Sequence, residues 1–276
     1  MEDVRRGLNE YSTAYADATD TTGNYKNEQI VDEINLANRF LYSLLLPRLP
    51  GVFLNSSDLT ASSSVLTLPT DFGKLRILKD PNGKVCYQRP IKNLTPGTSG
   101  NTRLFYRKGD TYVIEKTTLS TIYVIWYEKK ARDLDQGKAA GTDTLATSAV
   151  PIADYYNGMD IENVTDGEID EITDYSAGRV VTHTAQIDAD DYYGIISDIP
   201  EPFHNLLSAR AIIRLKDLHP ASMEKSTEGE RMNFVENLTE TLRAYAGQSI
   251  DLPPKETDYF GPEETIMSHR IERKKG

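Results

Sequence analysis

The sequence predicts an α+β protein in which three main helices form a helical bundle core. An inserted antiparallel β domain, a second small acidic β insertion and an extended C-terminal tail complete the expected fold. Three observations predict this class. Apolar residues recur at helical spacing in three segments, β-branched and aromatic residues alternate between the first two of these, and one segment concentrates the acidic side chains. The 276 residues suffice to bury a good-sized core.

The first helical segment runs from about residue 27 to 46. Its apolar residues recur at three- and four-residue steps: Ile30, Ile34, Ala37, Leu41, Leu44 and Leu45. Asn24 or Asn27 can cap its start, and Pro47 follows its end. Residues 1–50 are therefore expected to form an N-terminal arm and the first helix of the bundle.

Residues 51–135 are predicted to form the antiparallel β domain. Residues 64–68 alternate, and residues 121–128 (TIYVIWYE) are dense in β-branched and aromatic side chains. The turn sequences DPNG and KGD join further pairs of expected strands. These connections are too short for crossover helices, which favours antiparallel pairing. Cys86 lies within the alternating run KVCYQ and is expected to be a buried structural thiol.

Residues 136–199 are expected to form a loop followed by the acidic β insertion. Between residues 153 and 201, thirteen Asp or Glu stand against the single basic Arg179, a net charge of −12. Alternate carboxylates at Asp166, Glu168 and Asp170 resemble a calcium loop, but the EF-hand pattern is not met. We therefore treat them as a weak calcium candidate beside the alternative of a solvated acidic face. A segment this acidic should repel a DNA backbone.

Residues 200–246 are predicted to form a two-helix hairpin that completes the bundle. In the helix from about residue 202 to 218, apolar residues cover most of the circumference, which indicates burial on more than one side. We expect six of them to form the bundle core or a contact with neighbouring subunits: Phe203, Leu206, Leu207, Ile212, Ile213 and Leu215. A third helix, about residues 222–246, has one apolar arc. Residues 247–276 form the predicted extended tail, which lacks periodicity.

The sequence offers little sign of catalytic or membrane chemistry. It contains no Walker-type phosphate loop, no Rossmann fingerprint and no His-Glu-x-x-His motif, and its four histidines are scattered. We expect each histidine to lie at the surface or at a helix end. Neither an apolar run long enough to span a bilayer nor the apolar region of a secretory signal is present. We therefore expect no enzyme activity, no cofactor, no resident metal and synthesis in the cytoplasm.

The order of the segments is similar to that of a known family. Leu68, Pro69, Asp71 and Phe72 before a strand, and a strand ending in residues 127–130, resemble the β domain of the tailed-bacteriophage head-to-tail adaptors, the connector or neck proteins. The run Pro200, Glu201, Phe203, His204, Leu206 and Leu207 resembles the start of their central helix. The resemblance spans most of residues 27–246, and the order of its degenerate motifs carries it.

The resemblance implies a structural virion protein in the neck of the particle. It implies a ring of twelve copies bound to the portal protein, with tail or nozzle proteins below and double-stranded DNA passing without specific binding. It also implies that the tail clasps the portal, and we expect the contacts from Tyr259, Phe260, Ile266, Met267, Arg270 and Arg273. In such a ring the acidic insertion, with Asp188, Asp190 and Asp191, faces either the DNA channel or the outside.

Two other functions stay open from the sequence. A tail completion or tail terminator protein should share the β domain but lack the two-helix hairpin. A β-rich carbohydrate-binding module on the virion surface should display aromatic side chains clustered on one loop face, whereas the sixteen tyrosines are spread through the chain.

Overall fold

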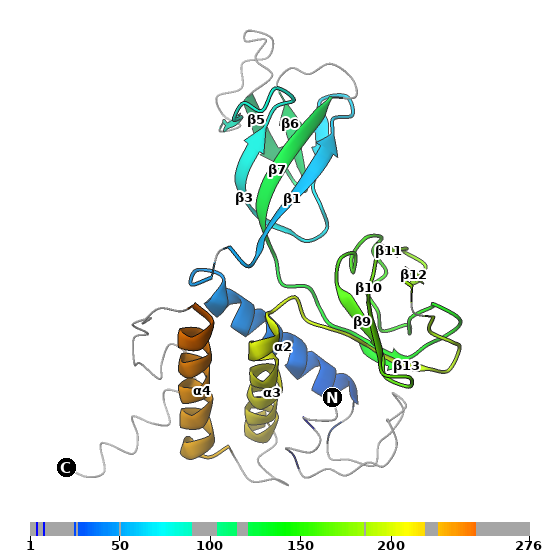
Figure 1. The fold of residues 1–276 in the computed structure, drawn as a ribbon, viewed down its shortest axis with the longest axis vertical. Coiled ribbons are helices and arrows are strands. Elements are labelled where there is room, and N and C mark those ends of the chain that lie inside the picture. Colours follow the sequence, from blue (N-terminus) through cyan, green and yellow to red (C-terminus); the bar gives the residue numbers. More distant parts are fainter. Residues whose placement is uncertain are drawn as a thin grey trace, which may run out of the picture. The chain divides into compact units, whose positions relative to one another are not determined.

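The computed structural model describes Val4, Leu8, Tyr25 and residues 27–49, 51–89, 104–114, 121–184, 186–218 and 226–246. The chain divides into two compact units (Figure 1). One unit joins the described residues up to Asn38 with those from Ile199 onward, and the other spans Arg39–Asp198. Within the described residues, no helix combines the length and the apolar character needed to cross a membrane.

The prediction of a helical bundle core was wrong. The described residues form three α-helices and thirteen strands in four sheets, so the fold is β-rich. Two of the three helices, α3 and α4, belong wholly to one unit, whereas α2 crosses the boundary between the units at Asn38. Long amphipathic helices give a strong periodic signal in a sequence, while short strands with polar faces give almost none. The strong helical patterns therefore led to the prediction that the helices form the core of the protein.

The first β module, residues 54–129, is a sandwich of two sheets. One sheet has the order β1-β7-β3, and the other has the order β2-β6-β5-β4. The strands are β1 (Leu54–Thr60), β2 (Val65–Thr67), β3 (Phe72–Lys79), β4 (Tyr87–Gln88), β5 (Leu104–Lys108), β6 (Thr111–Ile114) and β7 (Ile122–Lys129). All pairs are antiparallel except β4 with β5, which is parallel and departs from the predicted all-antiparallel arrangement.

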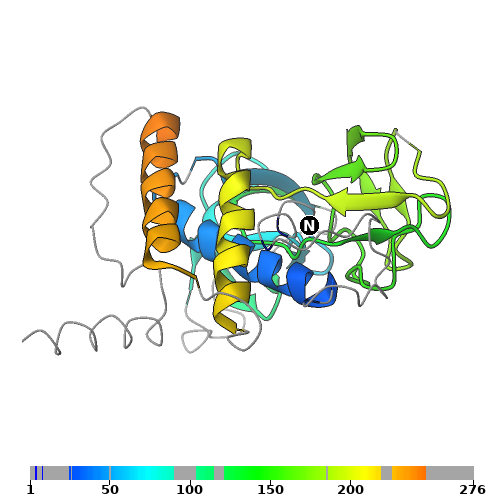
Figure 2. The same ribbon diagram turned by 90° about the horizontal axis from the view of Figure 1, so that it is seen from below.

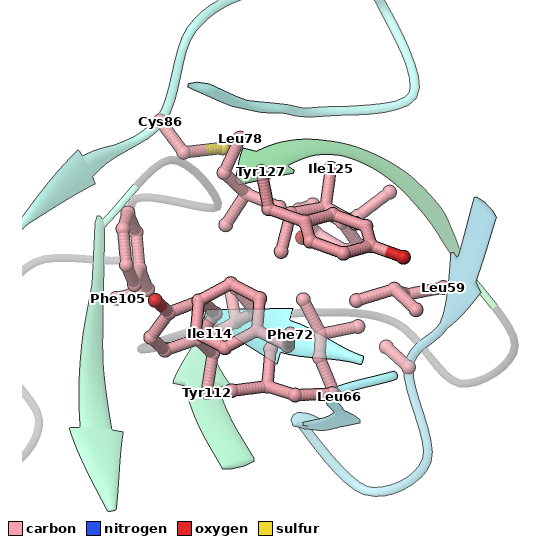
Figure 3. Packing of buried hydrophobic residues seen from close by; sticks show 13 residues of the cluster. Leu59, Leu66, Phe72, Leu78, Cys86, Phe105, Tyr112, Ile114, Ile125 and Tyr127 are labelled. Atoms are coloured by element: carbon pink, nitrogen blue, oxygen red, sulfur yellow. The ribbon is translucent and has the colours of Figure 1, made fainter. Parts of the chain in front are cut away.

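Alternation along the strands builds the core of this sandwich. Tyr123, Ile125 and Tyr127 of β7 point inward and are at most 2% exposed. Ile125 and Tyr127 face the inward side chains of the other sheet, including Phe105 and Tyr112, as Figure 3 shows. Cys86 is buried in the same cluster, as expected from its alternating context. Only Leu59 of β1 is buried, so this strand has no alternating apolar pattern in the sequence.

The second β module, residues 136–195, contains a four-stranded sheet with the order β10-β9-β13-β8 and a separate pair, β11-β12. The strands are β8 (Gln136–Lys138), β9 (Asp160–Asn163), β10 (Glu168–Glu171), β11 (Asp174–Tyr175), β12 (Val181–Thr182) and β13 (Tyr192–Ile195). Its own buried cluster includes Tyr156, Tyr175 and Tyr193. The sequence predicts short strands at residues 168–174, 179–185 and 192–196, and β10, β12 and β13 lie within these ranges, whereas β8 and β9 were not predicted.

The helices α3 (His204–Leu218) and α4 (Glu228–Ala246) pack side by side, with the short 3₁₀ helix η2 (Glu201–Phe203) leading into α3 (Figure 2). The third helix is α2 (Asn27–Leu45). Two contacts join α2 and the residue Tyr25 before it to α3. The hydroxyl of Tyr25 donates to the carbonyl oxygen of Leu215 at 2.8 Å, and the guanidinium of Arg214 contacts the carboxylate of Glu33 at 2.6 Å. The two ends of the chain therefore build one helical unit.

A capping box fixes the start of α4. The hydroxyl of Thr227 accepts from the amide of Glu230 at 3.1 Å, and the carboxylate of Glu230 accepts from the amide of Thr227 at 2.8 Å. The ammonium of Lys216, on α3, contacts the same carboxylate at 2.6 Å. This one carboxylate therefore caps α4 and ties it to α3.

We predict that replacing Gly73 with Ala destabilises the first β module. Gly73 lies at the irregularity between Phe72 and Lys74 of β3, and a Cβ there would approach the carbonyl oxygen of Glu128 to 2.8 Å. Because the obstacle is backbone, the strand must shift, at a cost of about 1–3 kcal/mol. Chemical denaturation measures the loss. Gly51→Ala is the matched control, since a Cβ there meets nothing within 4 Å. Equal stability of the two variants would contradict the prediction.

We also predict that Glu230 contributes a pH-dependent stabilisation. Burial raises the pKa of Glu230, but hydrogen bonds from Lys216 and Thr227 lower it by more than burial raises it. The pKa of Glu230 therefore lies below the ordinary 4.5. The stabilisation is therefore complete above pH 4.5 and is lost as the pH falls through the folded-state pKa. Glu230→Gln should reduce the unfolding free energy at neutral pH by up to about 1 kcal/mol.

The helical circular dichroism signal during denaturation, followed from neutral to acid pH, checks this prediction. The difference between the wild type and Glu230→Gln should shrink as the pH falls below 4.5. Glu240→Gln, at an exposed position of the same helix, serves as the control and should change little at any pH. A difference that stays constant with pH would show that the charge of Glu230 contributes nothing.

Candidate functional site

The outer face of the sheet β1-β7-β3 is unusually apolar. Alternation along β7 places Ile122, Val124 and Trp126 on the side opposite its buried residues. Ile122 is 50% exposed and Trp126 38% exposed. On the neighbouring strand Ile77 pairs with Trp126 and is 40% exposed. Exposed apolar groups gathered on one face of a sheet indicate a contact surface more than isolated ones do.

Basic side chains of β3 border this apolar stripe. Lys74 pairs with Glu128, Lys79 pairs with Val124, and the guanidinium of Arg76 contacts the carboxylate of Glu128. On the other side of β7, Asp58 of β1 is the one acidic residue that pairs with the stripe. We call this surface the β7 face and define it by these residues: Ile122, Val124, Trp126, Ile77, Lys74, Arg76, Lys79 and Asp58.

The outer face of the sheet β10-β9-β13-β8 is acidic. Ile169 of the edge strand β10 is 60% exposed and pairs with Glu162. Glu171 pairs with Asp160. Gly194 pairs with Glu162 from the other side, and a Cβ placed there would meet nothing within 4 Å, so this part of the face is open. We call this surface the β10 face and define it by Ile169, Asp160, Glu162, Glu171 and Gly194.

A buried ion pair links the start and the end of the second β module. The side chain of Arg132, which follows β7, is 1% exposed, and its guanidinium contacts both carboxylate oxygens of Asp198, Oδ2 at 2.8 Å and Oδ1 at 3.0 Å. It also donates to the carbonyl oxygens of Tyr155 and Asn157, at 3.1 and 2.7 Å. Arg132 and Asp198 are 66 residues apart in the sequence. The pair therefore holds together the two chain segments that enter and leave the module.

Buried tyrosines extend this polar framework. The hydroxyl of Tyr127 donates to Asp71 at 2.7 Å in the first β module, and that of Tyr193 donates to Asp135 in the second. Burial raises the pKa of the Asp135 carboxyl. Burial likewise raises the pKa of Tyr175 to about 12, and its hydroxyl donates to the carbonyl oxygen of Val150 at 2.8 Å. These hydroxyls therefore act as neutral donors that fix loops to strands.

The structure does not gather the weak calcium candidates into a site. Asp166 accepts from the side-chain amide of Asn163 at 3.1 Å, and Asp170 accepts from the hydroxyl of Thr184 at 2.6 Å, while Glu168 is exposed on β10. Among the described residues, no group of three or more His, Cys, Asp or Glu could hold a metal ion. These carboxylates act as turn and strand partners.

His183 corrects one expectation. Its side chain is 1% exposed, although we expected every histidine at the surface or at a helix end. One ring nitrogen lies 3.3 Å from Asp143 and the other 3.9 Å from Asp170.

The three acidic residues expected to face a channel or the outside are close in sequence but play different roles. Asp190 is exposed and pairs with Lys138 at 2.9 Å. Asp188 accepts from the side-chain amide of Gln186 at 2.6 Å. Asp191 closes the turn by accepting from the amide of Asp188 at 2.9 Å. Asp191 is therefore a structural residue of the turn, while Asp190 presents charge at the surface.

Five of the six apolar residues of the central helical segment are buried within the single chain. Phe203, Leu206, Leu207, Ile213 and Leu215 are at most 7% exposed, and Ile212 is half-buried. The burial of these residues is explained by α4 and the N-terminal end of the chain, without neighbouring subunits. Their role in a subunit contact stays a prediction. The tail residues Tyr259, Phe260, Ile266, Met267, Arg270 and Arg273 lie outside the described residues.

Sequence reasoning missed the Arg132–Asp198 pair and both sheet faces. Arg132 stands in a charged run, KKARD, where nothing distinguishes a buried arginine from a solvated one. The β7 face had a signal, because TIYVIWYE is apolar on both sides of the strand and not only on alternate positions. In comparison with known proteins, the chain matches no family model and no curated protein.

We predict that Arg132→Met destabilises the protein strongly, by about 3–5 kcal/mol. The substitution leaves the carboxylate of Asp198, which is 11% exposed, without its main counterion. Arg39→Met is the matched control. Arg39 also contacts a carboxylate, that of Asp133, but the two side chains are 53% and 36% exposed, so its loss should cost no more than about 1 kcal/mol. Urea denaturation compares the variants, and similar losses would contradict a special role for Arg132.

Proposed function

We propose that this chain is a structural virion protein, the head-to-tail adaptor of a tailed bacteriophage. Its copies form a ring that binds the portal protein, contacts tail or nozzle proteins, and continues the channel for DNA. The proposal places the protein in the neck of the virion after its synthesis in the bacterial cytoplasm.

The observation that carries the proposal is the order in which the chain builds its parts. The chain runs through α2, the first β module, the second β module, η2 with α3, and α4. The motif Leu68-Pro69 followed by Asp71-Phe72 leads into β3, and the motif from Pro200 to Leu207 opens η2 and α3. The resemblance to the adaptors rests on the order of these segments. A helical unit closed by both ends of the chain can anchor one partner, while the inserted β modules present other surfaces.

Two observations favour an adaptor over its rivals. The helices α3 and α4 pack against each other, and a tail terminator should lack this hairpin. A carbohydrate-binding module should gather aromatic side chains on one loop face. The exposed aromatic residues in the described part of the chain, Tyr87, Trp126 and Tyr245, lie instead on β4, β7 and α4.

The electrostatics suit a conduit for DNA. The second β module has a net charge of −10, against −11 for the whole chain, and a ring repeats it around the axis. Carboxylates such as that of Asp190 repel phosphates, so the passing duplex would not adhere where this module faces the channel. Where the module faces outward, the same charges form a solvated rim.

We predict that the C-terminal tail is required for binding to the portal. Purified full-length protein and a variant that ends at Ala246 are each mixed with portal rings made from the portal gene of the same viral genome. Sedimentation and electron micrographs then record binding. The full-length protein should form a ring on the portal, and the shortened variant should bind far more weakly, because its tail contacts are gone.

The helical circular dichroism of the shortened variant controls for folding. A full-length protein that does not bind the portal would overturn the proposed function. A shortened variant that binds as tightly as the full chain would remove the tail from the mechanism and leave the adaptor function standing.

A further inference from the structure

The two β modules carry opposite charge. Residues 54–129 contain eleven Lys or Arg and six Asp or Glu, a net charge of +5. Residues 136–195 contain two basic and twelve acidic side chains, a net charge of −10. The two modules of one chain therefore have the charge signs of two partners that attract each other.

The same complementarity recurs within the two sheet faces defined above. On the β7 face, an apolar stripe around Trp126 is bordered by Lys74, Arg76 and Lys79. On the β10 face, the exposed Ile169 is surrounded by Asp160, Glu162 and Glu171. Each face thus offers an apolar centre with charges of one dominant sign at its border. An apolar centre with a charged border is the composition of a protein–protein interface.

We propose that the β7 face of one copy docks onto the β10 face of a second copy. Trp126 and Ile77 would cover Ile169 and the open surface at Gly194, while the lysines of β3 would meet the carboxylates of β9 and β10. This contact deepens the proposed function, on which it rests, because it supplies the lateral contact of the ring.

A contact between two different faces determines the kind of assembly. Each copy that uses its β7 face keeps its β10 face available for the next copy, so the contact is heterologous. Heterologous contacts propagate until they close into a ring or continue as a filament. Every copy in a closed ring uses both faces, and equal numbers of the two faces are guaranteed because one chain carries both.

A second copy suits the β7 face better than nucleic acid does. Contacts to the phosphates of duplex DNA come from basic and polar groups, and the three exposed apolar side chains of this face, Ile77, Ile122 and Trp126, contribute nothing to them. The β10 face repels phosphate, since Asp160, Glu162 and Glu171 border it. The surface that complements the β7 face has an apolar centre and an acidic border. The chain itself contains such a surface, the β10 face.

Charge reversal tests the contact. Lys74→Glu with Lys79→Glu reverses the β7 face, and Glu162→Lys with Glu171→Lys reverses the β10 face. Arg76 is kept, because its partner Glu128 is 3% exposed and the loss of Arg76 would leave a buried carboxylate without its counterion. Sedimentation velocity in low salt measures association of the full-length chains, alone and on portal rings. Each double variant should associate about ten- to a hundredfold more weakly than the wild type.

Mixing provides the decisive result. The two double variants are expected to be monomeric apart and to associate when mixed, because each acquires a face that fits the other. The chain that carries all four substitutions should associate with itself again. High salt should weaken every one of these assemblies. Lys84→Glu with Lys108→Glu, two exposed lysines outside both faces, is the matched control and should associate like the wild type.

The outcomes separate this contact from the proposed function. Double variants that associate like the wild type, or a mixture that shows no restored association, would overturn the contact. A wild-type chain that forms no oligomer either alone or on the portal would overturn it as well. Binding of the full-length chain to the portal is scored separately, and its absence would remove the adaptor function even if copies associate.

Discussion

The buried pair of Arg132 and Asp198 is the interaction on which the second β module depends. A buried charge pair costs desolvation energy that its Coulomb attraction barely recovers, so its value lies in what it specifies. Here the orientation of the guanidinium is fixed, because it also donates to the carbonyl oxygens of Tyr155 and Asn157. The chain that leaves the first β module is thereby fixed to the chain that returns toward α3. The β10 face has a defined shape because the base of its module is closed.

How much of this fold is predictable depends on the element. The helices α2, α3 and α4 and the strand β7 have dense, regular apolar patterns, and their approximate places follow from the sequence. The strand β1 buries only Leu59, no residue of β8 is fully buried, and β9 buries Ile161 and the polar Asn163, which is 2% exposed. Such strands exist because their neighbours pair with them, and pairing across long sequence separations cannot be seen in local periodicity. This explains why the helical bundle was overestimated.

The candidate site divides in the same way. The apolar character of β7 on both sides is visible in the sequence, whereas the choice of which side is exposed depends on the second sheet of the sandwich. Likewise, the apolar circumference of α3 was correctly recognised, but its cover comes from Tyr25, Glu33 and α4, far away in the chain. Burial of a helix on several sides therefore does not by itself require neighbouring subunits. The acidity of the second β module follows directly from the sequence. The open surface at Gly194 depends on the folded structure and cannot be predicted from the sequence.

The contacts that close the helical unit have a consequence for biosynthesis. Arg214 binds Glu33 across 181 residues, and Tyr25 binds Leu215 across 190. A ribosome adds about 5–20 residues per second, so the nascent α2 waits on the order of ten seconds or more before its partners emerge. Both β modules emerge completely in that interval and can fold first. The helical unit is therefore completed after the β modules have emerged, because α3 is made late.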